Sequence, residues 1–212
     1  MFELLPGREC ALCPRLKSFI DENRKIYPDK YNAPVPSFGP KDAQLLIVGL
    51  APGLKGANFS GRPFTGDYAG ELLYETLLKF GFAKGTYQAR IDDGLALVNA
   101  RITNAVKCVP PENKPTGGEI NTCLQFLSRE IDDMPDIEVI LSLGLVSHNA
   151  VLKATGHKQS AFKFVHNAVH DLGGGRKLID SYHCSRYNTN TGRLTSAMFE
   201  DVFETIIKHL PS

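Results

Sequence analysis

Hydrophobic and polar positions along the chain form blocks that predict strands and helices in turn. Short, uninterrupted apolar runs predict buried strands, whereas apolar residues at helical spacing, such as Phe199, Val202 and Phe203, predict amphipathic helices. The expected strands are 43–48, 100–106, 137–143, 168–172 and 177–182. The expected helices are 14–23, 69–80, 115–132, 145–154 and 195–210, and Pro115 is expected as the first helical residue of the third.

Strands that alternate with helices imply a mostly parallel sheet covered on both faces. The 212 residues, of which 42% are hydrophobic, are enough for one sizeable core, so we expect a single domain over 1–212. Ligands bind at the carboxyl ends of strands in such sheets. We therefore expect the loops after Val48, Ile102 and Ile179 to lie close together.

Charge and hydropathy narrow the function classes only slightly. The formal net charge of +1 neither indicates nor excludes a nucleic-acid partner. No apolar run approaches the roughly 18 residues that cross a membrane, and the N-terminus lacks the segments of a secretory signal. We expect a cytoplasmic protein, so the five cysteines are interpreted as reduced thiols or metal ligands rather than disulfides.

Four of the cysteines are candidate metal ligands. Cys10 and Cys13 form a C-x-x-C pair, and Cys108 and Cys123 add two more thiols. Four thiolates suit zinc or an iron–sulfur cluster equally well, although a single C-x-x-C pair has low specificity. Cys184 is interpreted as a non-ligand thiol.

The glycine-rich segment GLAPGLKGANFSGRPFTGDYAG, residues 49–70, joins the first expected strand to a helix. Its position is typical of a phosphate-binding loop, but neither G-x-G-x-x-G nor Gly-Lys-Ser/Thr occurs in it. It carries Phe64 and Asp67 instead. Asp67 suits either a helix N-cap or a carboxylate at the mouth of a cleft, and Phe64 suits either the core or stacking on a base.

The other two loops supply amide, imidazole and basic groups. Asn104 has two interpretations. Its amide can offer a donor and an acceptor to the edge of a base, or it can be a turn residue whose hydrogen bonds are satisfied locally. His183 is a catalytic candidate because of its place at the same sheet edge, although single histidines are more often structural. Arg186 and Arg193 bracket tyrosine and asparagine residues, a mixture that suits a phosphate backbone or a solvated loop.

Three motifs follow one another along the chain: GLAPG…G.N..GRPFTGD.AG, TNAVKC.PP.NKP and H.S..N..TGRLT. With the four cysteines, they make the chain resemble the family 5 (type B) uracil-DNA glycosylases from Cys10 to about Thr195. The resemblance implies a three-layer α/β/α sandwich with a central, mostly parallel four-stranded sheet. It also implies an enzyme that hydrolyses the N-glycosidic bond of uracil, and of deaminated bases such as hypoxanthine, in DNA and leaves an abasic site.

The resemblance implies roles for single residues. Asp67 matches the carboxylate that supports attack of water at the sugar, and Phe64 the ring that stacks on the flipped base. Asn104 matches the amide that reads the base, and His183 the histidine that faces the base carbonyl; both are expected in catalysis and in substrate binding. Ala51 is a further expected substrate-binding residue.

The resemblance also implies DNA-contacting residues and a cofactor. The expected DNA-binding residues follow the strand expected at 177–182. They are Ser185, Arg186, Tyr187, Asn188 and Arg193. The expected ligands of a structural [4Fe-4S] cluster, with zinc as the less expected occupant, are Cys10, Cys13, Cys108 and Cys123. The expected partner is uracil-containing DNA, bound by a monomer that has no contact with a membrane.

The chain departs from the family pattern at two places. Asn58-Phe59-Ser60 replaces Asn-Arg-Thr, which removes a cationic contact, and His183-Cys184-Ser185 replaces His-Pro-Ser. Leu50 stands where type A relatives carry an acidic residue, which favours type B. A non-catalytic iron–sulfur DNA-binding protein on the same fold is the main alternative, and a nucleotide-binding flavodoxin-like protein is a weaker one.

Overall fold

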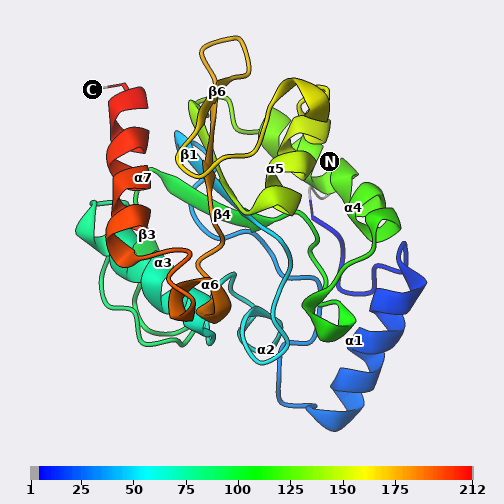
Figure 1. Cartoon of the computed structure of the whole chain (residues 1–212). Helices are drawn as coiled ribbons and strands as arrows, with labels where there is room; N and C mark the ends of the chain where they lie inside the picture. The colour runs from blue at the N-terminus through cyan, green and yellow to red at the C-terminus, as the bar shows by residue number, and fades with distance from the viewer. Residues whose placement is uncertain (1–4, 212) are drawn as a thin grey trace.

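The computed structural model describes residues 5–211 and has a five-stranded sheet at its centre (Figure 1). The strand order is β4-β1-β5-β7-β6. The strands are β1 (Leu45–Gly49), β4 (Ala100–Asn104), β5 (Val139–Leu143), β6 (Val169–Asp171) and β7 (Lys177–Ser181). The first three and β7 are parallel, and β6 is antiparallel to β7.

The sheet therefore has five strands where four were expected. The strand beyond the four that the resemblance implied is β6, which lies within the strand expected from the sequence at 168–172 and forms a hairpin with β7 at the sheet edge. The turn between them contains Gly173, Gly174 and Gly175, all with positive φ. Glycine adopts this backbone region at no steric cost, so the three residues allow the chain to reverse tightly.

Helices cover both faces of the sheet, which confirms the three-layer α/β/α arrangement (Figure 1). Helices α3 (Tyr68–Lys79) and α7 (Ser196–His209) pack on one face. Helices α4 (Gly117–Asp132) and α5 (Leu145–Ala154) pack on the other. Leu45 and Ile47 of strand β1 lie in the first core, and Leu46 and Val48 lie in the second, which explains the uninterrupted apolar pattern of 45–48.

Helix α1 (Pro14–Ile26) builds a third, smaller core beside the sheet. Its Leu16 and Ile20 pack against Val106, Cys108 and Cys123. This core joins the N-terminal segment to the loop after β4 and to the first half of α4. None of the helices in the described range is long and apolar enough to cross a membrane.

The sequence pattern located the long elements to within a few residues, with one correction at the start of α4. Pro115 lies before this helix, because Thr116 is the N-cap. The Thr116 hydroxyl accepts the N–H of Glu119 at 3.2 Å, and the Glu119 carboxylate accepts the N–H of Thr116 at 2.7 Å. The reciprocal bonds fix the helix start two residues later than expected.

Several short elements were not predicted, because a single turn or a two-residue strand is too short to show periodicity. They are α2 (Ala57–Ser60), α6 (Arg186–Asn190), the hairpin strands β2 (Ala83–Lys84) and β3 (Ala96–Leu97), and the 3-10 turns η1 (Pro111–Asn113) and η2 (Gln159–Ala161).

Candidate active site

The loops that follow β1, β4 and β7 meet at the carboxyl end of the sheet, where ligands of such folds bind. The ladder between β1 and β4 continues past the strand ends. Gly49 pairs with Asn104, and the N–H groups of Ala105 and Val106 donate to the carbonyls of Gly49 and Leu50 at 2.9 and 3.0 Å. The first loop is thus fastened to the second at its root.

Gly49 brings Asn104 and Phe64 together. A Cβ atom on Gly49 would lie 2.4 Å from Asn104 Oδ1 and 2.6 Å from Phe64 Cζ, so a larger residue would force both side chains away. Asn104 is only 3% exposed, and its Oδ1 has no hydrogen-bond partner among the described residues. A buried acceptor of this kind is costly unless a ligand satisfies it.

His183 also lies beside Phe64. The Phe64 and His183 rings have centroids 6.0 Å apart and planes inclined by 29°. His183 Nδ1 is buried and has no partner in the part of the chain that the structure describes. Burial lowers the pKa of His183 to about 4, so the imidazole is neutral near pH 7.

Asp67 takes the helix N-cap role that its sequence position allowed. It is the N-cap of α3, where Oδ1 accepts the N–H of Gly70 at 3.2 Å. Its other oxygen faces the first loop, because a Cβ atom on Gly53 or Gly56 would lie 3.2 or 2.5 Å from Oδ2. Burial raises the pKa of Asp67, against the hydrogen bonds from the main chain. The cap thus fixes a carboxylate of increased basicity beside the loop.

The predicted DNA-binding residues belong to the start of α6 and the turn after it. Ser185 and Asn188 serve the local structure, since Ser185 caps the helix and Asn188 Nδ2 donates to the His183 carbonyl at 2.8 Å. Arg186, Tyr187 and Arg193 are exposed, with Tyr187 at 73%. These three side chains are therefore accessible to a partner, and the other two support the His183 loop.

The four cysteines of the predicted ligand set line one small cavity between the N-terminal segment, α4 and the loop after β4. Burial is the main cause that raises the pKa of Cys108 to about 12, and the neighbouring sulfurs raise it further in the same direction. Burial also raises the pKa of Cys13 and Cys123. The Lys107 N–H donates to Cys123 Sγ at 3.3 Å. Four convergent thiols in an apolar shell fit a metal or cluster whose positive charge stabilises thiolates.

Two further sequence expectations concern Ala51 and Cys184. Ala51 packs against the core that contains Cys108 and Cys123, so the first loop contacts the cysteine region. Cys184 is fully buried in the core beneath α3 and α7, away from the cavity of the other four cysteines. Its place agrees with its interpretation as a non-ligand thiol.

The residues that hold the Phe64 turn were not predicted from the sequence. Arg62 is 3% exposed, and its guanidinium donates to Asp93. The Tyr87 hydroxyl donates to the Phe64 carbonyl at 3.2 Å. Arg62 stands within the quoted motif, but Asp93 and Tyr87 lie in a segment without any recognisable pattern.

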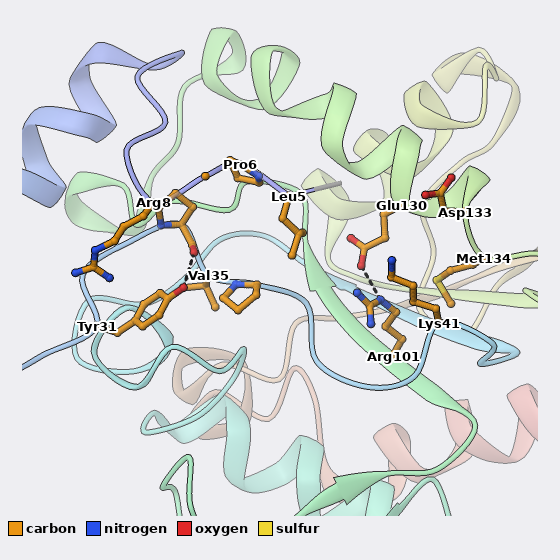
Figure 2. A pocket seen from close by; sticks show the side chains of 13 residues that line it. Leu5, Pro6, Arg8, Tyr31, Val35, Lys41, Arg101, Glu130, Asp133 and Met134 are labelled. Atoms are coloured by element: carbon orange, nitrogen blue, oxygen red, sulfur yellow. Dashed lines mark hydrogen bonds and ion pairs between the residues drawn. The ribbon is translucent and has the colours of Figure 1, made fainter. Parts of the chain in front are cut away.

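A separate cavity of about 520 Å³ lies between the N-terminal segment, the 31–41 stretch and the end of α4 (Figure 2). Arg101 Nε donates to Glu130 Oε1 at 2.8 Å at its edge. Although burial opposes ionisation, Lys107 and Arg101 lower the pKa of Glu130 to about 2. The described residues that line this cavity include none of the predicted site residues.

The geometry defines an α/β protein in which Asn104 and His183, each with an unpartnered buried atom, both lie beside Phe64. A carboxylate caps α3 at the same sheet edge, and four thiols line a separate cavity. A family model described as the uracil DNA glycosylase superfamily matches residues 36–207. The chain therefore belongs to the uracil DNA glycosylase superfamily.

Individual relatives narrow this further. A type-5 uracil-DNA glycosylase of Thermus thermophilus is 43% identical over 91% of this chain and 90% of its own length. A type-5 enzyme of Pyrobaculum aerophilum is 38% identical, with 91% and 85% covered. A type-4 enzyme of Sulfurisphaera tokodaii is 31% identical, with 86% and 79% covered. The chain groups with the type-5 members, as the motifs predicted.

Proposed function

We propose that this protein is a DNA glycosylase that excises uracil, and other deaminated bases such as hypoxanthine, and leaves an abasic site. The observation that carries the proposal is the pair of buried atoms, Asn104 Oδ1 and His183 Nδ1, that lack protein partners among the described residues and belong to side chains beside the Phe64 ring. We place the extruded base in a recess between these three side chains, because a base offers an aromatic face to Phe64 and a polar edge to Asn104 and His183. Membership of the superfamily and the type-5 relatives support the same reaction.

Base recognition is assigned to the walls of this recess. Phe64 stacks on the flipped base, and the Asn104 amide pairs with the polar edge of the base. Ala51 contributes the main-chain wall of the first loop. Arg186 and Tyr187, exposed at the start of α6, contact the DNA around the lesion.

The reaction breaks the C1′–N bond and joins a water oxygen to C1′. Positive charge develops on the sugar and negative charge on the departing base. The Asp67 carboxylate stabilises the sugar cation, orients the water and accepts its proton. Neutral His183 donates a hydrogen bond to the base oxygen on which negative charge accumulates. Asp67 must be ionised, so activity falls with acid as its raised pKa is crossed.

Cys10, Cys13, Cys108 and Cys123 would hold a [4Fe-4S] cluster, which we assign a structural role because the hydrolysis transfers no electrons. The cysteine cavity shares its core with Ala51 and Val106, next to the recess. A cluster there braces the wall that carries Asn104. We further propose that the chain acts as a single-domain monomer on cytoplasmic DNA.

The test is excision from labelled duplexes that carry one uracil or one hypoxanthine, with alkali to cleave abasic sites. Wild-type protein is expected to give strand breaks without added magnesium. Asp67→Asn is expected to slow them by about 10²–10³-fold, because the base and charge stabiliser is lost. Glu71→Gln, an exposed carboxylate in the first turn of the same helix, is the matched control and retains activity.

Two results would contradict parts of the proposal. Iron-containing protein that binds the duplex but cleaves neither base would indicate the non-catalytic iron–sulfur binder. Excision of uracil without hypoxanthine would restrict the substrate range. Iron content and the visible absorption of the purified protein, compared with Cys123→Ser, distinguish a cluster from zinc.

A further inference from the structure

Arg62 and Asp93 form a buried ion pair beside the active site, and the proposed chemistry uses neither residue. Arg62 Nη1 and Nη2 donate to the two Asp93 carboxylate oxygens at 2.9 and 2.7 Å. The side chains are 4% and 0% exposed. This two-bond fork fixes the relative orientation of the two groups as well as their distance.

Asp93 is itself held in place by the main chain around it. Besides Arg62, it accepts the N–H groups of Gln88 and Leu95 at 3.0 and 3.1 Å. The hydrogen bonds from Arg62 hold the pKa of Asp93 far below its ordinary value, so the carboxylate stays ionised. The segment between β2 and β3 thus supplies a fixed anion.

The other side of the guanidinium reaches the active-site turn. Arg62 Nε donates to Thr65 Oγ1 at 2.7 Å. The guanidinium carbon also lies 5.2, 5.5 and 5.9 Å from the ring centroids of Phe38, Tyr74 and Tyr87. The cation therefore joins Asp93 to Thr65 through an aromatic enclosure that limits its movement.

The turn at 63–67 requires such support because its central residue is strained. Phe64 has φ of +53°, a region that residues with a side chain rarely adopt. The Tyr74 hydroxyl donates to the Pro63 carbonyl at 2.6 Å, and the Tyr87 hydroxyl donates to the Phe64 carbonyl at 3.2 Å. A Cβ atom on Gly70 would lie 1.7 Å from the Phe64 oxygen, so α3 packs directly on this peptide.

We propose that Arg62 is a positioning residue for base excision: anchored on Asp93, it holds the 63–67 turn in the conformation that presents Phe64 and Asp67 to the extruded nucleotide. This inference rests on the proposed glycosylase function. Arg62 is too deeply buried to contact DNA, so its effect reaches the substrate through the turn. Lysine cannot replace it, because one ammonium group cannot form the fork and the Thr65 bond together.

The experiment is uracil excision under single-turnover conditions, with enzyme in excess, at a temperature where circular dichroism shows each variant folded. Asp93→Asn and Arg62→Lys are expected to slow excision by about 10–100-fold, because a small misplacement of reacting groups has this effect. The Kd for the duplex is expected to stay within about threefold, since the exposed α6 residues are unchanged.

Asp92→Asn is the matched control. Asp92 is the neighbouring residue and pairs with Arg90 at 2.7 Å, but both side chains are about two-thirds exposed. This variant is expected to retain the wild-type rate. Tyr87→Phe loses only the hydroxyl that donates to the Phe64 carbonyl, and it is expected to slow excision less than Asp93→Asn. If Asp93→Asn does not fold, Tyr87→Phe tests the inference in its place.

Three outcomes would overturn the inference. Folded Asp93→Asn and Tyr87→Phe with the wild-type rate would show that the turn needs no such anchor. A loss that follows the folded fraction alone would make the pair purely structural. Wild-type protein that does not excise uracil would remove the proposed function as well, and this failure is visible before any variant is measured.

Discussion

Histidines His183 and His148 both lie beside β7, and their surroundings are opposite. His183 Nδ1 is buried without a partner among the described residues, and burial lowers the pKa of the ring to about 4. His148 has a partner at each nitrogen, Asp180 Oδ1 at 2.7 Å and the Phe162 carbonyl at 3.1 Å. Burial opposes its charge, but Asp180 raises the pKa of His148 overall.

The His148 region resembles a metal site, although its polar groups are already satisfied. One ligand-type atom each from His148, His170 and Asp180 lie within 4.8 Å of one another. Asp180 also accepts from His170 at 2.9 Å and from the Ser142 hydroxyl at 2.7 Å. Since both partners of His148 are acceptors, protons on both of its nitrogens complete the network.

The comparison shows why the number of polar groups is a weaker guide to function than their satisfaction. A buried polar atom without a partner lowers stability by about 1–3 kcal/mol, so a place where two of them lie beside one ring is a candidate for binding a ligand. A satisfied network needs no ligand. On this basis we propose that substrate binds at Asn104 and His183, whereas the His148 network holds β5, β6, β7 and α5 together.

The largest expected effect is the loss of excision in Asn104→Ala. The uracil excision rate is expected to fall by about 10²–10³-fold, as for other preorganised hydrogen-bonding groups. The free energy of unfolding is expected to stay unchanged or to rise, because an unsatisfied acceptor is removed. Single-turnover kinetics and chemical denaturation measure the two quantities. An unchanged excision rate, or a lower free energy of unfolding, would contradict the proposal that the unpartnered Asn104 serves substrate binding.

His148→Phe is expected to have the opposite pattern. The free energy of unfolding is expected to fall by about 2–4 kcal/mol, because Asp180 is left as a buried charge with fewer donors. The excision rate of the folded protein is expected to stay within about twofold of wild type, since the network does not contact the recess. The double variant His148→Phe with Asp180→Asn is expected to recover part of the loss. A large rate defect in stable His148→Phe would instead connect the network to catalysis.

The expected effect that is smallest per pH unit is a pH dependence of stability with opposite sign at the two histidines. The pKa of His148 is raised by folding, so its stabilisation is present below pH 6.5 and is lost as pH rises through the folded pKa. The pKa of His183 is lowered to about 4, so protonation of the unfolded state reduces stability as pH falls from 6.5 toward 4. For each histidine, the free energy of unfolding changes by at most about 1.4 kcal/mol per pH unit.

Denaturation of wild type, His148→Phe and His183→Asn between pH 4 and 8 isolates the two contributions. The stability difference between wild type and His148→Phe is expected to shrink above pH 6.5. The His183→Asn variant is expected to lose less stability than wild type as the pH falls below 6.5. Parallel curves for all three proteins would mean that neither histidine changes its proton affinity on folding.

The sequence alone determined the parts of this protein that depend on local pattern. Uninterrupted apolar runs and helical spacing located the parallel strands and long helices, because periodicity is a property of neighbouring residues. The alternation of these elements then placed Asn104, His183 and the glycine-rich loop at one sheet edge. The resemblance of three ordered motifs gave Asp67 and the four cysteines their expected roles, and the cysteines do line one cavity.

Only the tertiary structure decided which side chains find partners. Arg62 and Asp93 are 31 positions apart, and His148 and Asp180 are 32 apart, without any local signal that joins them. The left-handed backbone of Phe64 likewise lies against residues farther along the chain, since Tyr87 donates to its carbonyl. Burial and hydrogen bonding are set by residues far along the chain, so His183 without a partner and His148 with two became distinguishable only in the folded protein.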